Sequence, residues 1–105
     1  MAETKIPKTY HAFIERFPEL GQAWQSMRAA EEKGPFDERS MRLIKLGIAF
    51  GCMREGPVHS GVRKALAAGV SREEIEQVVA LSASTIGLPS AVAMFSWVLD
   101  ELNKA

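Results

Sequence analysis

Residues 37–50 read Asp37-Glu38-Arg39-Ser40-Met41-Arg42-Leu43-Ile44-Lys45-Leu46-Gly47-Ile48-Ala49-Phe50. Asp37 stands where a helix N-cap is expected, because its carboxylate can accept a hydrogen bond from an amide of the first helical turn. The apolar residues from Met41 to Phe50 leave little polar surface on any side of such a helix. A helix of this kind must be covered by other elements. We therefore expect this segment to be the central helix of an all-helical domain.

Glycine, proline and capping residues divide the rest of the carboxyl-terminal half into helix-sized pieces. Residues 52–69 are expected to form one helix, with Gly56-Pro57 near its start and Gly69 as its C-cap. Ser71-Arg72-Glu73-Glu74 is a capping box, in which the side chains of Ser71 and Glu74 each bond the backbone amide of the other. It predicts a helix to about Ile86, and residues 87–89 turn the chain into a last helix. The apolar stripe expected on that last helix consists of Val92, Phe95, Leu99 and Leu102.

Two further helices are predicted before Asp37. The first runs from Lys8 to Phe17, and Pro18 ends it and opens the second, which continues to Lys33 and stops at Gly34-Pro35. No segment alternates between polar and apolar residues over enough positions to suggest a strand. We expect an all-α fold of about six helices, organised as one domain over residues 1–105.

The composition excludes several classes of function. The chain has 105 residues, and 13 basic residues balance 13 acidic ones. This balance argues against nucleic acid or an anionic membrane as a partner. Every apolar run is shorter than a membrane span and no targeting segment is evident, so we expect a cytoplasmic protein. With one cysteine and two histidines, no structural zinc site is expected, and we expect no metal and no cofactor.

Cys52, Glu55 and His59 are the candidate site residues, because they are spaced three and then four apart. On a continuous helix, such spacing places a thiol, a carboxylate and an imidazole on one face. A thiolate is favoured near a helix amino terminus or a protonated imidazole, and an imidazole can exchange protons near neutral pH. Pro57 permits this geometry only if the helix begins at about Met53 or later. Each residue also has an ordinary interpretation: a buried core thiol, a solvated carboxylate and a structural histidine.

Four segments at matching spacing carry a resemblance to a known family. They are Asp37–Ile44, Gly51–His59, Ala68–Ile75 and Ile86–Ala91. Together they resemble the carboxymuconolactone decarboxylase-like domain over residues 37–93, a family that also holds the alkylhydroperoxidase D-type peroxidases. The resemblance implies an alkylhydroperoxidase D-like helical fold and a homo-oligomer, either a trimer or a hexamer built from dimers.

The site segment combines features of two branches of this family. The peroxidase branch carries Cys-x-x-Cys-x-x-x-His, which Cys52 and His59 match, but Glu55 replaces the second cysteine. Arg42 stands about where that branch has a proton-relaying glutamate. The decarboxylase branch has Gly-x-x-x-Glu-x-x-x-His, which Gly51, Glu55 and His59 match.

The favoured hypothesis is a thiol-dependent oxidoreductase of the peroxidase type. Cys52 would attack a hydroperoxide, Glu55 and His59 would relay protons, and an external thiol would reduce the enzyme again. The alternative is a cofactor-free lyase acting on a small carboxylated lactone, with His59 as general acid or base and Glu55 orienting it. Arg42 or Arg54 would then hold a substrate carboxylate. A third possibility is a non-catalytic oligomeric domain.

Two structural expectations follow from these hypotheses. Cys52, Glu55 and His59 should line one pocket together with Ile44 and the turn at residues 87–89. The second expectation is that apolar residues off the main helical stripes are covered by another subunit, because a chain of this length can bury only a limited fraction of its surface. These residues are Val79, Ile86, Met94 and Trp97.

Overall fold

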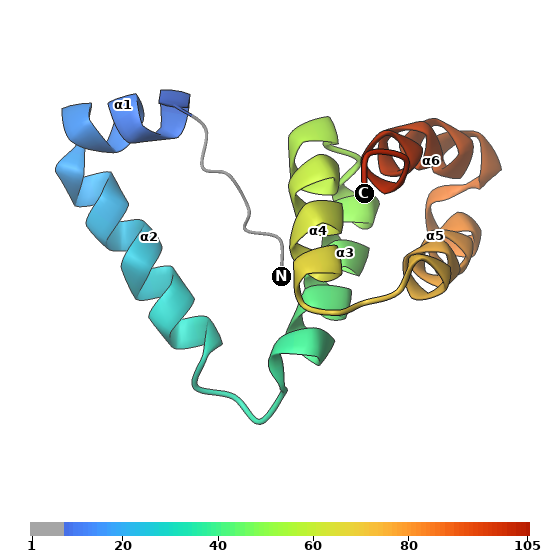
Figure 1. The fold of residues 1–105 in the computed structure, drawn as a ribbon, viewed down its shortest axis with the longest axis horizontal. Helices are drawn as coiled ribbons and strands as arrows, with labels where there is room; N and C mark the ends of the chain where they lie inside the picture. The colour runs from blue at the N-terminus through green and yellow to red at the C-terminus, as the bar shows by residue number, and fades with distance from the viewer. Residues whose placement is uncertain (1–7) are drawn as a thin grey trace. The chain divides into compact units, whose positions relative to one another are not determined.

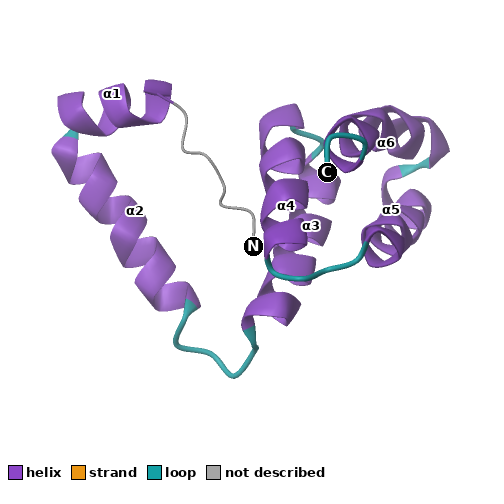
Figure 2. Cartoon of the chain, in the orientation of Figure 1, coloured by secondary structure: helices purple, strands orange, loops and turns teal. Residues whose placement is uncertain are grey.

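The computed structural model describes residues 8–105, which form six helices and no strand (Figures 1 and 2). The helices are α1 (Lys8–Arg16), α2 (Pro18–Glu31), α3 (Glu38–Cys52), α4 (Glu55–Ala67), α5 (Arg72–Ile86) and α6 (Leu88–Leu102). The predicted all-α class is therefore confirmed. By their contacts, the described residues form two compact units, residues 8–35 and residues 36–105.

The amino-terminal unit contains α1 and α2, and Pro18 opens α2 as the sequence predicts. The two helices approach closely at Gly21, where an added Cβ would lie 3.3 Å from the side chain of Ile14. The rings of Phe13 and Phe17 lie 5.4 Å apart, but neither helix contains a buried residue. The large apolar side chains that remain exposed on this unit are Phe13, Phe17, Leu20, Trp24 and Met27.

The second unit is a four-helix arrangement in which α3 and α6 each contact both α4 and α5. Its core is formed by Leu46, Ala49, Phe50, Val58, Val62, Ala65, Val70, Ile75, Met94, Val98 and Leu102. Each large apolar side chain that is fully buried contributes about 1.5–3 kcal/mol to folding. The core therefore takes residues from all four helices and from the α4–α5 connection, and it fixes α4 against α6.

Two sequence expectations about packing need correction. Met94, expected at a subunit boundary, is fully buried in this core, and Val79, Ile86 and Trp97 pack against the core from its edge. The apolar stripe of α6 is also rotated from the predicted one, because Val92 is 63% exposed. The buried face of α6 instead consists of Ala91, Met94, Val98, Glu101 and Leu102.

Both predicted N-caps are present. The Asp37 side chain accepts a hydrogen bond from the Ser40 amide at 2.7 Å, and this bond lowers the pKa of the Asp37 carboxyl. At Ser71, both bonds of the capping box form. The Ser71 amide and the Arg39 guanidinium, which also pairs with Glu74, lower the pKa of the Glu74 carboxyl to about 2.

The predicted helix over residues 52–69 begins later than expected. Helix α3 continues past Gly51 to Cys52, and Met53 then adopts the left-handed conformation with φ of 53°. Helix α4 begins at Glu55, so Pro57 lies in its first turn, where the backbone amides have no helical partner to lose. A helix that began at Cys52 would have placed this proline past the first turn, where it disrupts hydrogen bonding.

Candidate functional site

The best-defined polar cluster in the described residues surrounds His59, on the second turn of α4. Its Nε2 atom lies 3.1 Å from Oε2 of Glu55, one turn earlier on the same helix. Its Nδ1 atom lies 2.5 Å from Oε2 of Glu101, which α6 supplies. The histidine side chain is 18% exposed, and that of Glu55 is 60% exposed. The imidazole is therefore held between a buried carboxylate and one at the surface.

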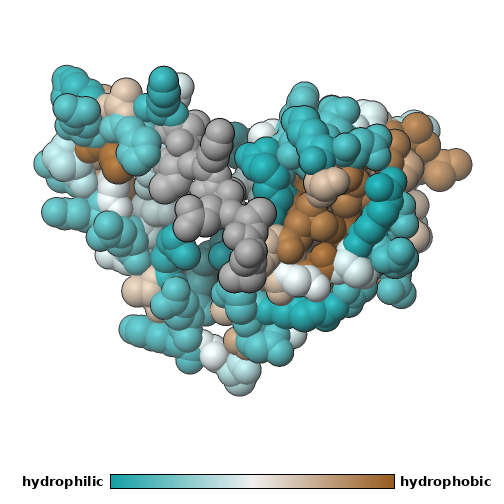
Figure 3. Space-filling view, in the orientation of Figure 1, coloured by the Kyte–Doolittle hydropathy of each residue, from teal (hydrophilic) through white to brown (hydrophobic). Residues whose placement is uncertain are grey.

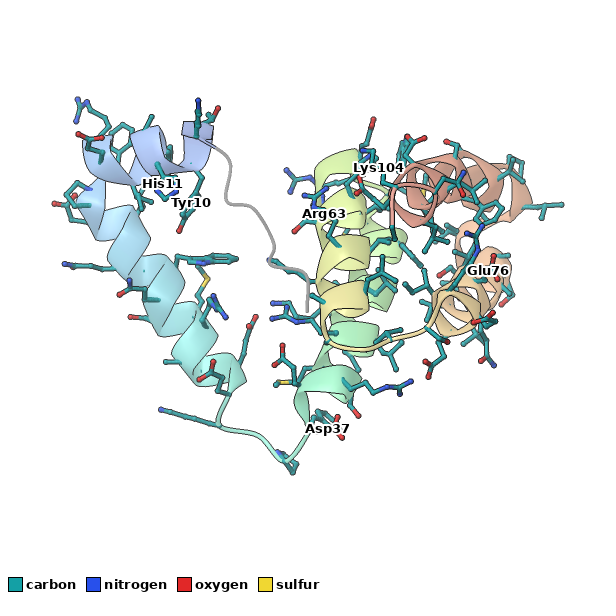
Figure 4. All side chains as sticks on the ribbon, viewed as in Figure 1. Tyr10, His11, Asp37, Arg63, Glu76 and Lys104 are labelled. Carbon is teal, nitrogen blue, oxygen red and sulfur yellow. The ribbon has the colours of Figure 1, made fainter. Side chains whose placement is uncertain are left out.

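Glu101 is the buried member of this cluster, and it is not among the residues predicted from the sequence. Arg63 lies 3.2 Å from its carboxylate and Lys104 lies 3.6 Å from it; both cations are labelled in Figure 4. Burial raises the pKa of Glu101, but the hydrogen bond from His59 and the charges of Arg63 and Lys104 outweigh it, so the pKa is lowered overall. The carboxylate is therefore ionised at neutral pH. A glutamate near the end of a largely apolar helix would have been the signal for it.

Cys52 is not part of this hydrogen-bonded cluster. It is an exposed free thiol and the last residue of α3, two residues before the N-cap residue Arg54 of α4. In the part of the chain that the structure describes, neither Glu55 nor His59 forms a hydrogen bond with it. The rule that residues three and four apart share a face applies only within one helix, and the break at Met53 interrupts it. The structure thus joins Glu55 to His59 but leaves Cys52 outside their network.

The two candidate substrate-binding arginines differ in their surroundings. The Arg42 side chain is bound to Glu38 on its own helix, with Nε 2.9 Å from Oε1. Along the axis of α3, Arg42 and Cys52 are separated by ~15 Å. Arg54 is exposed and occupies the N-cap position of α4, next to Glu55. Along the chain, Arg54 therefore lies closer to Glu55 and His59 than Arg42 does.

A groove of about 530 Å³ lies between α3 and α5. Its lining residues are Leu43, Ile44, Gly47, Gly51, Glu74, Gln77, Val78, Leu81, Ser82, Thr85 and Ile86. Ile44 lines it as expected, but Cys52, Glu55, His59 and the turn at residues 87–89 do not. Hydrophobic residues also gather between α4 and α5 on the face drawn in Figure 3. The groove and the His59 cluster are separate features of this unit.

Two classes of site are not found in the described part of the chain. Residues 8–105 contain no group of three histidine, cysteine, aspartate or glutamate side chains that could hold a metal ion. Among the helices that the structure describes, none is long and apolar enough to cross a membrane.

The helical fold and the segment that carries His59 are those of one protein family. Residues 18–100 match the Carboxymuconolactone decarboxylase family, and the chain belongs to that family. The match begins at α2 and so extends beyond the resemblance over residues 37–93 that the motifs carry. Comparisons with curated proteins and with solved structures found no match.

Proposed function

We propose that this protein is a cofactor-free enzyme that transfers a proton at His59 to or from a small carboxylated substrate, as a carboxy-lyase or isomerase does. The observation that carries this proposal is the contact of both imidazole nitrogens with carboxylates. A general acid or base needs a fixed ring and access to solvent or substrate. The buried carboxylate of Glu101 fixes the ring, and the partial exposure of His59 gives it access to solvent or substrate.

In the lyase reaction, the bond between the substrate carbon and its departing carboxylate breaks. The electron pair stays on that carbon, delocalised into a neighbouring carbonyl as an enolate, and carbon dioxide leaves. Protonated His59 then gives its Nε2 proton to the carbon, and water restores the proton. Glu55 can move aside during this step because its side chain is 60% exposed. Arg54 would hold a second carboxylate of the substrate through a paired hydrogen bond.

A second candidate function is thiol-dependent reduction of a hydroperoxide, which the exposure of Cys52 favours. The Cys52 sulfur would attack the peroxide, break its oxygen–oxygen bond and become a sulfenic acid, while the alcohol leaves with a proton relayed by His59 and Glu55. One external thiol would then form a mixed disulfide with release of water, and a second would free Cys52. The position of the thiol outside the His59 network makes this the weaker candidate.

The experiment that separates the two functions compares His59→Gln with Cys52→Ser. Carbon dioxide release from carboxylated lactones and peroxide consumption with a dithiol are measured for each variant. We expect His59→Gln to lose ~10²–10⁴-fold in lyase rate and Cys52→Ser to keep it. His11→Gln, in the exposed part of α1, is the matched control. Peroxide turnover that disappears in Cys52→Ser would establish the second function, and no turnover of either kind would favour a non-catalytic domain.

We also propose that the protein is a homo-oligomer, a trimer or a hexamer built from dimers. Apolar side chains exposed on both units support this, because burial against another copy would remove them from water. On the unit of residues 36–105 these are Phe36, Ile44, Ile48, Leu81, Leu88 and Val92. Sedimentation velocity at micromolar concentration tests the proposal, and a stable monomer there would refute it.

A further inference from the structure

The carboxylate of Glu101 constrains which nitrogen of His59 carries a proton. An ionised carboxylate can only accept hydrogen bonds. Because Nδ1 of His59 lies 2.5 Å from Glu101 Oε2, Nδ1 must be the donor in this contact. The neutral imidazole then keeps its single proton on Nδ1, and Nε2 is left unprotonated. When the ring takes up a second proton, Nε2 can donate to Glu55 at 3.1 Å.

The two carboxylates therefore have different roles. Glu101 lies on α6, is 5% exposed, and is also contacted by Arg63 and Lys104. Those two side chains are 43% and 71% exposed, so the cations face solvent while the carboxylate does not. Glu55 has no such confinement, because its side chain is mostly exposed. The Glu101 carboxylate is therefore fixed at Nδ1, whereas the Glu55 carboxylate can move away from Nε2.

We propose that Glu101 is a positioning residue that fixes the Nδ1–H tautomer and the ring orientation of His59, so that Nε2 is the nitrogen that exchanges protons with substrate. This inference rests on the proposed function of His59. It means that α6 contributes a residue to the site in addition to Glu55 and His59, which both lie on α4. The ionisable groups around the ring are Glu55 of α4 and Glu101 of α6, which contact it, and Arg63 of α4 and Lys104 beyond the end of α6, which contact Glu101.

The tautomer can be measured directly, without a substrate. In protein labelled with ¹⁵N-histidine, long-range ¹H–¹⁵N spectra at alkaline pH distinguish a protonated ring nitrogen from an unprotonated one. The chain has two histidines, so the exposed His11 serves as an internal reference. We expect His59 to show a protonated Nδ1 and an unprotonated Nε2. Native His59 with its proton on Nε2 would overturn the proposal, and this result requires no variant.

Two variants separate positioning from a merely structural role. Glu101→Leu replaces the hydrogen-bond acceptor with an apolar side chain of similar size, which suits a buried helical position. This variant should shift His59 toward the Nε2–H form. Arg63→Gln removes one ion pair of Glu101 but leaves the His59 contact, so the tautomer should not change. A folded Glu101→Leu protein that keeps the Nδ1–H form would refute the proposal, as would an equal tautomer shift in Arg63→Gln.

The catalytic readout distinguishes failure of this inference from failure of the proposed function. Loss of the residue that orients a metal-bound histidine typically costs about tenfold to a hundredfold in activity, and we take the same magnitude as a guide for His59. We expect Glu101→Leu to lower kcat by this factor with little change in KM. If the native tautomer is as proposed but His59→Gln leaves the lyase rate unchanged, the proposed function fails while the positioning of His59 stands. If Glu101→Leu shifts the tautomer and keeps full kcat, the positioning role in catalysis is refuted.

Discussion

Gly47 and Gly61 lie inside two packed helices, and replacing each with alanine should change stability in opposite directions. A Cβ at Gly47 of α3 would meet Val78 Cγ1 at 3.9 Å, which is an ordinary van der Waals distance. A Cβ at Gly61 of α4 would lie 3.2 Å from Leu46 Cδ1, which is tighter than side chains normally pack. Both substitutions remove the entropic cost of a helical glycine, about 0.5–1 kcal/mol.

The difference between the two sites comes from the neighbour that must move. At Gly47 nothing must move, so Gly47→Ala should raise the free energy of unfolding by about 0.5–1 kcal/mol. At Gly61, Leu46 is fully buried and has no solvent to move into. Overpacking a core typically costs about 1–3 kcal/mol. The net effect of Gly61→Ala should therefore be a loss of up to about 2 kcal/mol.

Urea denaturation followed by far-ultraviolet circular dichroism measures these changes, at several protein concentrations because assembly would add to the apparent stability. Gly51→Ala is the control, since nothing lies within 4 Å of a Cβ there and the residue is in the last turn of α3. We expect a small gain for it. A destabilised Gly47→Ala would mean that the groove between α3 and α5 is filled in solution, and a stabilised Gly61→Ala would refute the close approach of α3 and α4.

Three further outcomes are expected. Ser71→Ala should lower the free energy of unfolding by about 1 kcal/mol in urea melts because α5 loses its cap; an unchanged midpoint would contradict the capping box. The pKa of Glu74 is lowered from 4.5 to about 2, so its contribution to stability is complete above about pH 4.5 and is lost as pH falls through about 2. Urea midpoints measured against pH should show a weaker acid decline in Glu74→Gln, and an unaltered decline would count against this assignment. The exposed Cys52 should react with a maleimide in the folded protein about as fast as in urea, whereas protection of the thiol would show that it is covered.

The ends of the helices could be predicted from the sequence because capping is local. Asp37 and Ser71 each bond an amide three residues later, so the interaction depends on nothing beyond one helical turn. Pro18 also opens its helix where expected, since a first turn has no amide bond to lose. The pairing of Glu55 with His59 belongs to the same class, because both lie on one continuous helix.

The features that the sequence did not reveal depend on packing between helices. Helix α6 is apolar at so many positions that several stripes fit it equally well, and contact with α4 and α5 decides which face is buried. The predicted stripe through Val92 lies on the face opposite Glu101, so the pattern did not indicate that Glu101 is buried. The break between α3 and α4 was predicted at Gly51 and lies instead at Met53, for a related reason. A left-handed residue after Cys52 is required only because α3 must stop for α4 to pack against it.

The charge around His59 bears on the choice between the two candidate functions. When His59 is protonated, it joins Arg63 and Lys104 against the carboxylates of Glu55 and Glu101, and the cluster carries a net positive charge. Arg54, beside Glu55, adds to that excess. A positive field attracts an anionic substrate and gives no advantage to a neutral hydroperoxide. The glutamate that stands where a second cysteine would be needed for an internal disulfide also contacts the imidazole directly. A glutamate at this position thus leaves the chain without an internal redox pair and places a carboxylate against His59, and both observations favour the proposed acid–base chemistry over peroxide reduction.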